Sequence, residues 1–475
     1  MAVALVWFRD DLRLDDQPAL RAALDRGWLP VPVYIHAPDE EGAWAPGAAS
    51  NAWRRRALAA LSAELERRGS RLLVLHGHSL PLLQATAALT GAEAVLWARR
   101  YEPAVEQRDA RIKRELRRAG LHAESFNGSL LFEPWEVATK QGDPYRVFTP
   151  FWRTARAQWR APATWDAPAR LPSPEDAGAP HGVALDDILP APRPAWDAGF
   201  WQRFTPGETG ARQALARFAG RALDGYADAR DRAVEAGTSR LSPHLHFGEI
   251  SVQRVAATVN DADGIADGDR ERFLAELGWR EFAHHVLHYF PQVAERPLDP
   301  RFEDFRWARP LQARLAAWRH GRTGVPIVDA GMRELWHTGW MHNRVRMVVA
   351  SWLTKHLRMH WRHGARWFWD TLVDADLANN TQGWQWTAGT GADAAPYFRV
   401  FNPVSQARRF DPEGAYIARW VPELAALPLP ARFAPWEHPE LLRRHAPDYP
   451  RTPQVDLAEG RQAALAAFAA LRHAR

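Results

Sequence analysis

Ala2-Val-Ala-Leu-Val-Trp-Phe8 is the first of four short apolar runs that decide the fold of the amino-terminal part of the chain. The other three are Pro30–Ile35, Leu72–His76 and Ala94–Arg99. Helix-like stretches lie between them, at Gln17–Asp25 and Ala52–Arg68. Apolar runs that alternate with helices are typical of a parallel sheet with crossover helices. We therefore predict a doubly wound α/β domain over residues 1–130.

The sequence lacks the common nucleotide-binding signatures. No G-x-G-x-x-G motif follows the first apolar run, and no Walker A loop is present anywhere. Gly389–Ala394 formally matches a dinucleotide motif, but no strand is expected before it, so we interpret the match as chance. Ordinary dinucleotide or nucleoside-triphosphate use by this domain is unsupported.

The composition of the 475 residues narrows the class of protein. This length is enough for two or three domains. The absence of cysteine excludes disulfides, thiolate catalysis and cysteine-ligated metals, and it agrees with a reducing compartment. Arg9 and Asp10 interrupt the first apolar run, which is too short for a signal peptide or a membrane helix. We expect a cytoplasmic protein with no membrane partner, and the net charge of +5 permits a phosphate-bearing one.

A proline-rich stretch separates the α/β domain from a helical one. Prolines crowd residues 160–200, from Pro162 to Pro194, and this composition predicts a connector, which we place at 131–205. Over residues 206–475 apolar side chains recur every three and four residues, which predicts a mostly α-helical domain. The predicted helices are Gly207–Ala222, Arg272–Tyr289, Pro310–Trp318, Val328–His337, Asn343–Leu357, Arg366–Leu372 and Leu457–Arg475.

The block from Asp374 to Asn402 departs from an ordinary helical core. It begins Asp374-Ala-Asp-Leu-Ala-Asn-Asn-Thr-Gln-Gly-Trp-Gln-Trp386 and so combines carboxylates, amides and indoles. Buried polar groups must be hydrogen-bonded or they cost stability. We therefore interpret the block as built around a large polar aromatic cofactor.

Two further motifs combine charge with hydroxyl or aromatic groups. Gly237–Pro243 has the chemistry of a phosphate site at a helix N-terminus, although an ordinary cap is the competing interpretation. Tyr226 and Arg230 lie one helical turn apart upstream of it. On a helix, Glu276, Trp279 and Arg280 share one face, which suits a flat polar ligand or, alternatively, a surface ion pair beside a core tryptophan.

Metal chemistry has little support. Asp374 and Asp376 resemble the acidic pair of metal-dependent transferases, but divalent cations need several oxygen ligands and no third ligand is adjacent. Pairing of Arg346 with Asp374 is the alternative use of that carboxylate. The histidines at 284, 285, 288, 356 and 360 show no H-E-x-x-H pattern and are expected on helix surfaces. We predict no metal site.

Together, the order of these blocks resembles the photolyase and cryptochrome flavoprotein family along nearly the whole chain. Val6–Arg13 is similar to the family's opening strand and loop, Tyr145–Phe151 to its interdomain entry and Gly237–Pro243 to its FAD phosphate loop. The resemblance implies a U-shaped FAD in the helical domain. It also implies that the fully reduced, anionic cofactor transfers an electron to the substrate in light and that this electron later returns to the cofactor.

The subgroup expected from this resemblance is the class I photolyases of cyclobutane pyrimidine dimers. Trp340–Arg344 is similar to that class, and Trp279 and Trp386 match its two lesion-pocket indoles. Asn380 keeps an amide where plant-type cryptochromes carry an acid facing flavin N5. A non-repairing blue-light receptor is the alternative, and it would be a signalling protein.

The resemblance also implies roles for individual residues. Enzymes of this kind flip their target out of the DNA helix. The extruded dimer would be held by the indoles of Trp279 and Trp386, together with Glu276, Asn343 and Met347. Arg230, Arg344, Arg399 and Gln406 match positions expected to meet the DNA strand. The FAD ligands implied are Tyr226, Thr238, Ser239, Arg240, Leu241, Ser242, Arg280, Arg346, Asp374, Asp376 and Asn380. Trp384, Trp361 and Trp307 match an electron path from flavin to surface.

The antenna chromophore remains open. Folate-using members carry an Asn-Glu pair where this chain has Ala104 and Val105, and Glu106 is displaced by one residue. Methenyltetrahydrofolate, a deazaflavin, a second flavin and an empty site are the alternatives. The resemblance implies a monomer that acts on UV-damaged DNA.

Overall fold

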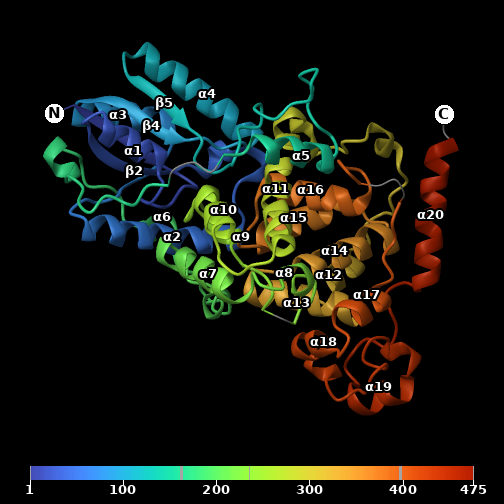
Figure 1. Cartoon of the computed structure of the whole chain (residues 1–475). Helices are drawn as coiled ribbons and strands as arrows, with labels where there is room; N and C mark the ends of the chain where they lie inside the picture. The colour runs from blue at the N-terminus through green and yellow to red at the C-terminus, as the bar shows by residue number, and fades with distance from the viewer. Residues whose placement is uncertain (1, 161–163, 235, 395–397, 474–475) are drawn as a thin grey trace. The chain divides into compact units, whose positions relative to one another are not determined.

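The computed structural model describes residues 2–160, 164–234, 236–394 and 398–473 (Figure 1). The chain divides into two compact units. Unit 1 contains residues 1–145, 149–224 and 239–291, and unit 2 contains residues 146–148, 225–238 and 292–475. The predicted boundaries at 130 and 205 follow the change of element type, and they remain predictions. Pro162, the Ala395–Tyr397 part of the aromatic block and the last two residues of the predicted terminal helix lie outside the described residues.

Unit 1 is built on a five-stranded parallel sheet in the order β3-β2-β1-β4-β5. Its strands are β1 (Val3–Phe8), β2 (Leu29–His36), β3 (Leu73–His76), β4 (Ala92–Ala98) and β5 (His122–Phe126). The crossover helices are α1 (Pro18–Asp25), α2 (Ala48–Arg67), α3 (Ser79–Thr90) and α4 (Pro103–Arg118). The predicted doubly wound sheet is confirmed, and the strand order reverses between β1 and β4.

Both faces of this sheet are covered, which explains why its strands are continuous apolar runs. All six residues of β1 are buried, and Leu5 and Trp7 pack with Val33, Val95 and Trp97 in one core cluster. Alternating polar residues would be expected if one face met water.

Buried polar contacts join the later helical part of unit 1 to the loop after β1 and to α2. The helices of this part are α5 (Phe148–Gln158), α6 (Leu185–Ile188), α7 (Glu208–Arg221), α9 (Ser242–His246), α10 (Val252–Asn260) and α11 (Asp267–Tyr289). The Arg13 guanidinium donates to the Gly248 carbonyl at 2.9 Å. The Glu249 carboxylate accepts from Trp53 Nε1 at 2.9 Å and from the Gly207 amide at 2.7 Å.

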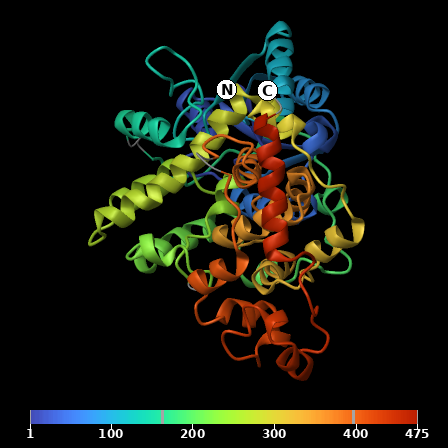
Figure 2. The same ribbon diagram turned by 90° about the vertical axis from the view of Figure 1, so that its right-hand side faces the viewer.

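Unit 2 is helical, as predicted for the second half of the chain (Figure 2). Its helices are α8 (Tyr226–Ala229), α12 (Gln312–Arg319), α13 (Pro326–Thr338), α14 (Asn343–Ser351), α15 (Trp361–Thr371), α16 (Leu377–Ala388), α17 (Pro403–Phe410), α18 (Ala415–Trp420), α19 (Pro439–His445) and α20 (Leu457–His473). α20 packs on a π-helical segment, η6 (Trp352–His356).

The structure corrects several of the predicted helices, and α11 also begins five residues earlier than predicted, at Asp267. The helix predicted at Asn343–Leu357 is α-helical only to Ser351 and continues as η6. α15 begins at Trp361, five residues before the predicted start, with His360 as its N-cap. α16 was not predicted as a helix, because its polar and aromatic residues lack an apolar stripe. Among the described residues, no helix is long and apolar enough to cross a membrane.

A buried carboxylate ties the carboxyl-terminal part of unit 2 to α13. Asp329 is fully buried and accepts bonds from the Thr323 amide at 2.7 Å, the Gly324 amide at 3.1 Å and the Tyr449 hydroxyl at 2.6 Å. Burial of a carboxylate is costly unless such donors surround it.

We predict that Tyr449→Phe lowers the free energy of unfolding by about 1–3 kcal/mol, because Asp329 loses one donor while it stays buried. Urea unfolding followed by circular dichroism measures this difference. Tyr289→Phe is the control, since no hydrogen bond of the Tyr289 hydroxyl to the described residues is present and its ring packing survives. Equal stability of Tyr449→Phe and wild type would contradict the role assigned to Asp329.

Candidate functional site

In unit 1, α11 carries the three residues predicted to share a helix face. Glu276, Trp279 and Arg280 are half-buried, whereas Leu277 and Gly278 between them are buried. A Cβ at Gly278 would meet the Trp152 ring at 2.4 Å, so this side of the helix packs tightly. The helical placement of the three residues is confirmed.

Arg280 is fixed by partners within unit 1. Its guanidinium donates to the Ser129 carbonyl at 2.7 Å and lies 3.4 Å from the Glu281 carboxylate. Glu281 also accepts from the amides of Leu131 and Phe132, at 2.8 and 3.2 Å. Burial raises the pKa of Glu281 to about 7, although Arg280 lowers it. Sequence reasoning missed Glu281, whose only signal was its position beside Arg280.

The predicted phosphate loop has a strained backbone followed by a short helix. Arg240 has a φ of 53°, a value that non-glycine residues adopt rarely. Ser239 Oγ accepts from the Leu241 amide at 3.3 Å, and α9 begins at Ser242. Thr238 belongs to unit 2, so the loop crosses from one unit to the other. The predicted helix start at this loop is confirmed.

In unit 2, Tyr226 and Arg230 lie together as their spacing predicted. Tyr226 is buried in α8, and the Arg230 guanidinium carbon lies 5.5 Å from the centre of its ring.

An ion pair links α14 to the residues that precede α16. The Arg346 guanidinium donates to both oxygens of Asp374, at 2.8 and 3.0 Å, and to the Met341 carbonyl at 2.8 Å. The Asp374 side chain is 3% exposed and that of Arg346 is 24% exposed. The ion pair expected from the sequence is confirmed, and it uses the carboxylate that a metal site would need.

The first turn of α16 holds two of the predicted cofactor residues. Asp376 caps the helix by accepting from the Asn379 amide at 2.8 Å. Asn380 Nδ2 donates to the Ala365 carbonyl at 3.0 Å, which fixes the plane of its amide. No group of three or more potential metal ligands occurs within the residues that the structure describes.

Trp384, Trp361 and Trp307, the tryptophans of the expected electron path, are called the path tryptophans below. Two of these three are buried. Trp384 packs against Phe368, with ring centres 5.0 Å apart, and Trp361 is fully buried. Their Nε1 atoms have no hydrogen-bond partner in the described part of the chain. Trp307 is half-buried and packs on Phe305, with centres 4.6 Å apart.

The residues expected at the lesion and at DNA lie on several elements. Asn343 starts α14, Met347 follows one turn later, and Trp386 is half-buried on α16, which packs on α14. Arg399 is exposed and Gln406 lies on α17. Glu276 and Trp279 belong to unit 1, so their combination with the unit 2 residues stays a prediction.

Arg344 has partners within unit 2. It pairs with Asp231 at 2.7 Å, and its guanidinium carbon lies 4.4 Å from the centre of the Phe410 ring. Phosphate binding by Arg344 would therefore compete with Asp231.

The expectation of surface histidines was wrong at three positions. His284, His285 and His356 are buried, at 7%, 1% and 5% exposure. Burial lowers the pKa values of His285 and His356 to about 4, which keeps them neutral at physiological pH. Segments distant in sequence, such as those of Tyr101 and Pro134, contact these histidines, which helical spacing alone does not reveal.

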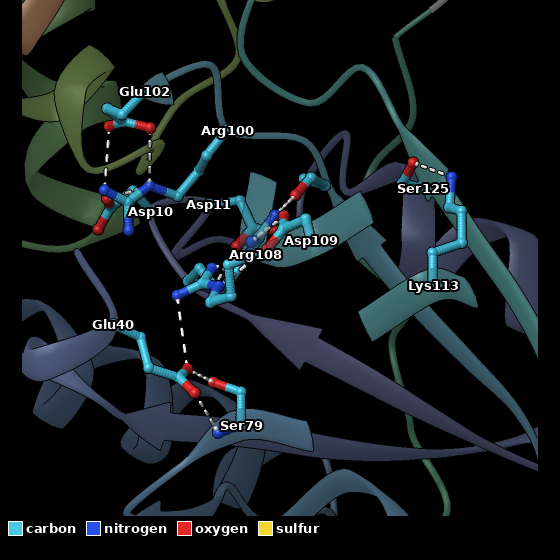
Figure 3. Close-up of polar contacts among 12 residues, drawn as sticks. Asp10, Asp11, Glu40, Ser79, Arg100, Glu102, Arg108, Asp109, Lys113 and Ser125 are labelled. Atoms are coloured by element: carbon cyan, nitrogen blue, oxygen red, sulfur yellow. Dashed lines mark hydrogen bonds and ion pairs between the residues drawn. The ribbon is translucent and has the colours of Figure 1, made fainter. Parts of the chain in front are cut away.

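The crevice at the carboxyl ends of β1 and β4 is lined by ion pairs (Figure 3). Arg100 pairs with Asp10, Glu41 and Glu102 at 3.2, 2.8 and 2.9 Å. Burial alone would raise the pKa of Asp10, but Arg100 and Arg54 hold it below its usual range. Ligands of such sheets bind at this point of strand reversal.

We predict that Gly364→Ala destabilises the protein by about 1–3 kcal/mol, because an added Cβ would lie 1.9 Å from the Trp384 ring. Thermal unfolding of the cofactor-free protein measures the loss. Adding Trp384→Phe frees the space of the outer indole ring, so the double variant should lose less stability than the sum of the single variants. Additive losses would contradict a direct contact.

Two family models match the chain. Residues 4–174 match the DNA photolyase model, and residues 273–470 match the FAD binding domain of DNA photolyase. FAD is therefore the cofactor of the helical part, as predicted.

Similar proteins cover the full length of the chain. It is 45% identical to the deoxyribodipyrimidine photo-lyase of Agrobacterium fabrum, over 99% of this chain and 98% of that one. It is 37% identical to cryptochrome-2 of Arabidopsis thaliana, over 92% of this chain and 73% of that one.

A solved structure of a bacterial class III photolyase from Agrobacterium tumefaciens is similar throughout. Its TM-score is 0.95 at 44% identity, and the match covers 99% of this chain and 98% of that one. The parallel-sheet domain, the helical FAD-binding part and the full-length identities agree. The chain belongs to the photolyase and cryptochrome family.

Proposed function

We propose that this protein is a deoxyribodipyrimidine photo-lyase that splits cyclobutane pyrimidine dimers in DNA with light. The observation that carries the proposal is the 45% identity to the Agrobacterium fabrum photo-lyase over 99% of the chain. Every residue type expected around the dimer is also present in this sequence. The (6-4) lesion is disfavoured, because the enzymes that repair it carry a histidine-rich sequence at the place where this chain has Trp340–Arg344.

The residues of unit 2 fit a flavin. Asn380 Nδ2 is held by the Ala365 carbonyl, and its oxygen accepts no hydrogen bond from the described residues, so it suits an N–H donor of reduced FAD. Arg346 stays partly exposed while Asp374 balances its charge. FAD, once bound, supplies the light-excited electron that splits the dimer. Residues of the Gly237–Pro243 loop hold its phosphates.

The lesion is held by stacking and edge contacts. Trp279 and Trp386 stack on the extruded pyrimidines, and each base stacked on an aromatic ring contributes about 1–3 kcal/mol. Glu276 and Asn343 bond the exposed polar edges, and Met347 packs beside them. A dimer has lost stacking in the duplex, so extruding it costs less than extruding ordinary bases.

DNA is bound through its phosphates by residues of unit 2. Arg230, Arg344, Arg399 and Gln406 supply cations and an amide, and such contacts make affinity depend on salt. Arg344 exchanges Asp231 for a phosphate when DNA arrives. The protein acts as a monomer in the cytoplasm in this proposal.

The subgroup is a separate question. Trp340–Arg344 supports class I, whereas the Agrobacterium tumefaciens structure is described as class III. The class III likeness extends over the whole chain and rests on far more residues than one motif. The dimer substrate is therefore proposed on full-length identity, and class I remains the prediction of that motif alone.

A blue-light receptor without repair activity is the second candidate, favoured by the 37% identity to cryptochrome-2. Its chemistry would use the same flavin site without a lesion pocket. The amide at Asn380 and the two indoles at Trp279 and Trp386 favour the photo-lyase.

We predict that photoreduced protein removes cyclobutane thymine dimers from an oligonucleotide under blue light, removes none in darkness, and leaves a (6-4) product intact. Chromatography of the digested oligonucleotide measures each lesion. A yellow, photoreducible protein that repairs neither lesion would replace the photo-lyase with the receptor.

We predict that Trp279→Ala weakens dark binding of the dimer oligonucleotide by roughly 5- to 150-fold, the equivalent of about 1–3 kcal/mol of lost stacking. Fluorescence anisotropy of a labelled oligonucleotide measures affinity. Trp196→Phe, at an exposed indole of the connector, is the control. If Trp279→Ala binds damaged and undamaged DNA as wild type does, Trp279 does not contact the lesion.

A further inference from the structure

The imidazole of His360 lies between two of the path tryptophans. Its ring centre is 5.1 Å from that of Trp307, in an edge-on arrangement, and 5.5 Å from that of Trp361, with the planes inclined by only 29°. A single conjugated ring therefore touches both the half-buried and the fully buried indole. All three residues belong to unit 2.

Backbone contacts fix this arrangement. His360 is the N-cap of α15, and its Nδ1 accepts from the Arg362 amide at 3.2 Å. The preceding turn is anchored where the Met359 amide donates to the Leu353 carbonyl at 3.0 Å. The Ala308 amide donates to the Arg358 carbonyl at 2.7 Å, which holds the segment of Trp307 against this turn.

The His360 ring is uncharged, which suits a position beside an indole that has lost an electron. Burial, with smaller contributions from Arg362 and His363, lowers its pKa to about 4, so the ring is uncharged at neutral pH. Because Nδ1 accepts the capping bond, the proton lies on Nε2. A charged imidazolium would oppose a positive indole, whereas the neutral ring does not.

The surroundings of the buried indole N–H groups favour transfer of an electron without a proton. Trp361 Nε1 and Trp384 Nε1 are buried without a hydrogen-bond partner in the described residues, so an indole that loses an electron there keeps its proton. The oxidised indole can then be neutralised only by receiving an electron. Trp307, which is half-buried, is the donor nearer the surface.

We propose that His360 bridges electron transfer from Trp307 to Trp361. This rests on the proposed function, in which these tryptophans reduce oxidised FAD. In each light-driven event Trp384 gives up one electron to the cofactor, and Trp361 replaces it. Trp307 replaces the electron of Trp361 through the His360 ring, and a soluble thiol then supplies Trp307. His360 is not oxidised itself; its ring couples the two indoles.

The competing role for His360 is that of a helix cap alone, and two substitutions separate the roles. His360→Asn keeps a side-chain acceptor for the Arg362 amide but removes the ring, because asparagine is a good N-cap. His360→Phe keeps an aromatic ring but removes the cap. A bridge predicts loss of photoreduction in the first variant, and a cap predicts loss in the second.

The experiment uses purified protein with oxidised FAD, without oxygen, with a thiol in excess and under blue light. The rate at which the visible absorption of oxidised FAD disappears is measured, together with the lifetime of the tryptophan radical after a laser flash. His360→Asn should be at least an order of magnitude slower than wild type. His360→Phe should stay within a factor of two, and so should His363→Asn, a control on the same helix.

Thermal unfolding of the cofactor-free variants gives an independent readout. His360→Asn should unfold near the wild-type temperature and His360→Phe below it. Wild-type photoreduction in His360→Asn, or equal slowing in both His360 variants, would overturn the bridge. Dimer repair by chemically reduced wild-type protein tests the proposed function by itself, so its failure is distinguishable from that of the bridge.

Discussion

The close contact between Trp384 and the backbone of α15 at Gly364 is the constraint on which the helical unit depends. The indole occupies the space that any side chain at position 364 would need, since a Cβ there would lie 1.9 Å from the ring. This contact sets the distance between α15 and α16. The Asp374–Arg346 ion pair ties the start of α16 to α14, and the hydrogen bond from Asn380 to the Ala365 carbonyl ties α16 to α15 a second time.

Hydrogen bonds and an ion pair within unit 2 explain how polar side chains are kept beside its apolar core. Asp374, Asp376 and Asn380 each have partners within unit 2: a guanidinium, a backbone amide and a backbone carbonyl. Satisfied in this way, they keep their positions without the stability cost of an orphaned polar group. In unit 1, Glu281 is the charged partner of Arg280, and Glu41 is a charged partner of Arg100 at the carboxyl end of the sheet. Both units therefore hold charged groups in fixed arrangements beside apolar cores.

The sequence predicted those parts of the fold in which one periodicity dominates. β1 to β4 were found because both sheet faces are covered and each strand is an apolar run. α16 was missed because Asn379, Asn380 and Gln382 interrupt the apolar stripe by which a helix is recognised. The Arg346–Asp374 pair was predicted from residue chemistry. The burial of His285 and the contact of His360 with Trp307 depend on neighbours distant in sequence, and no local pattern encodes them.

The central claim is that light moves an electron to the dimer and back with no net oxidation. The most direct measurement counts dimers lost per photoreduced protein molecule, without oxygen or added reductant and with damaged oligonucleotide in large excess. The account predicts many dimers split per molecule under blue light and none in darkness. Loss that stops at one dimer per molecule, or that proceeds equally in darkness, would contradict it.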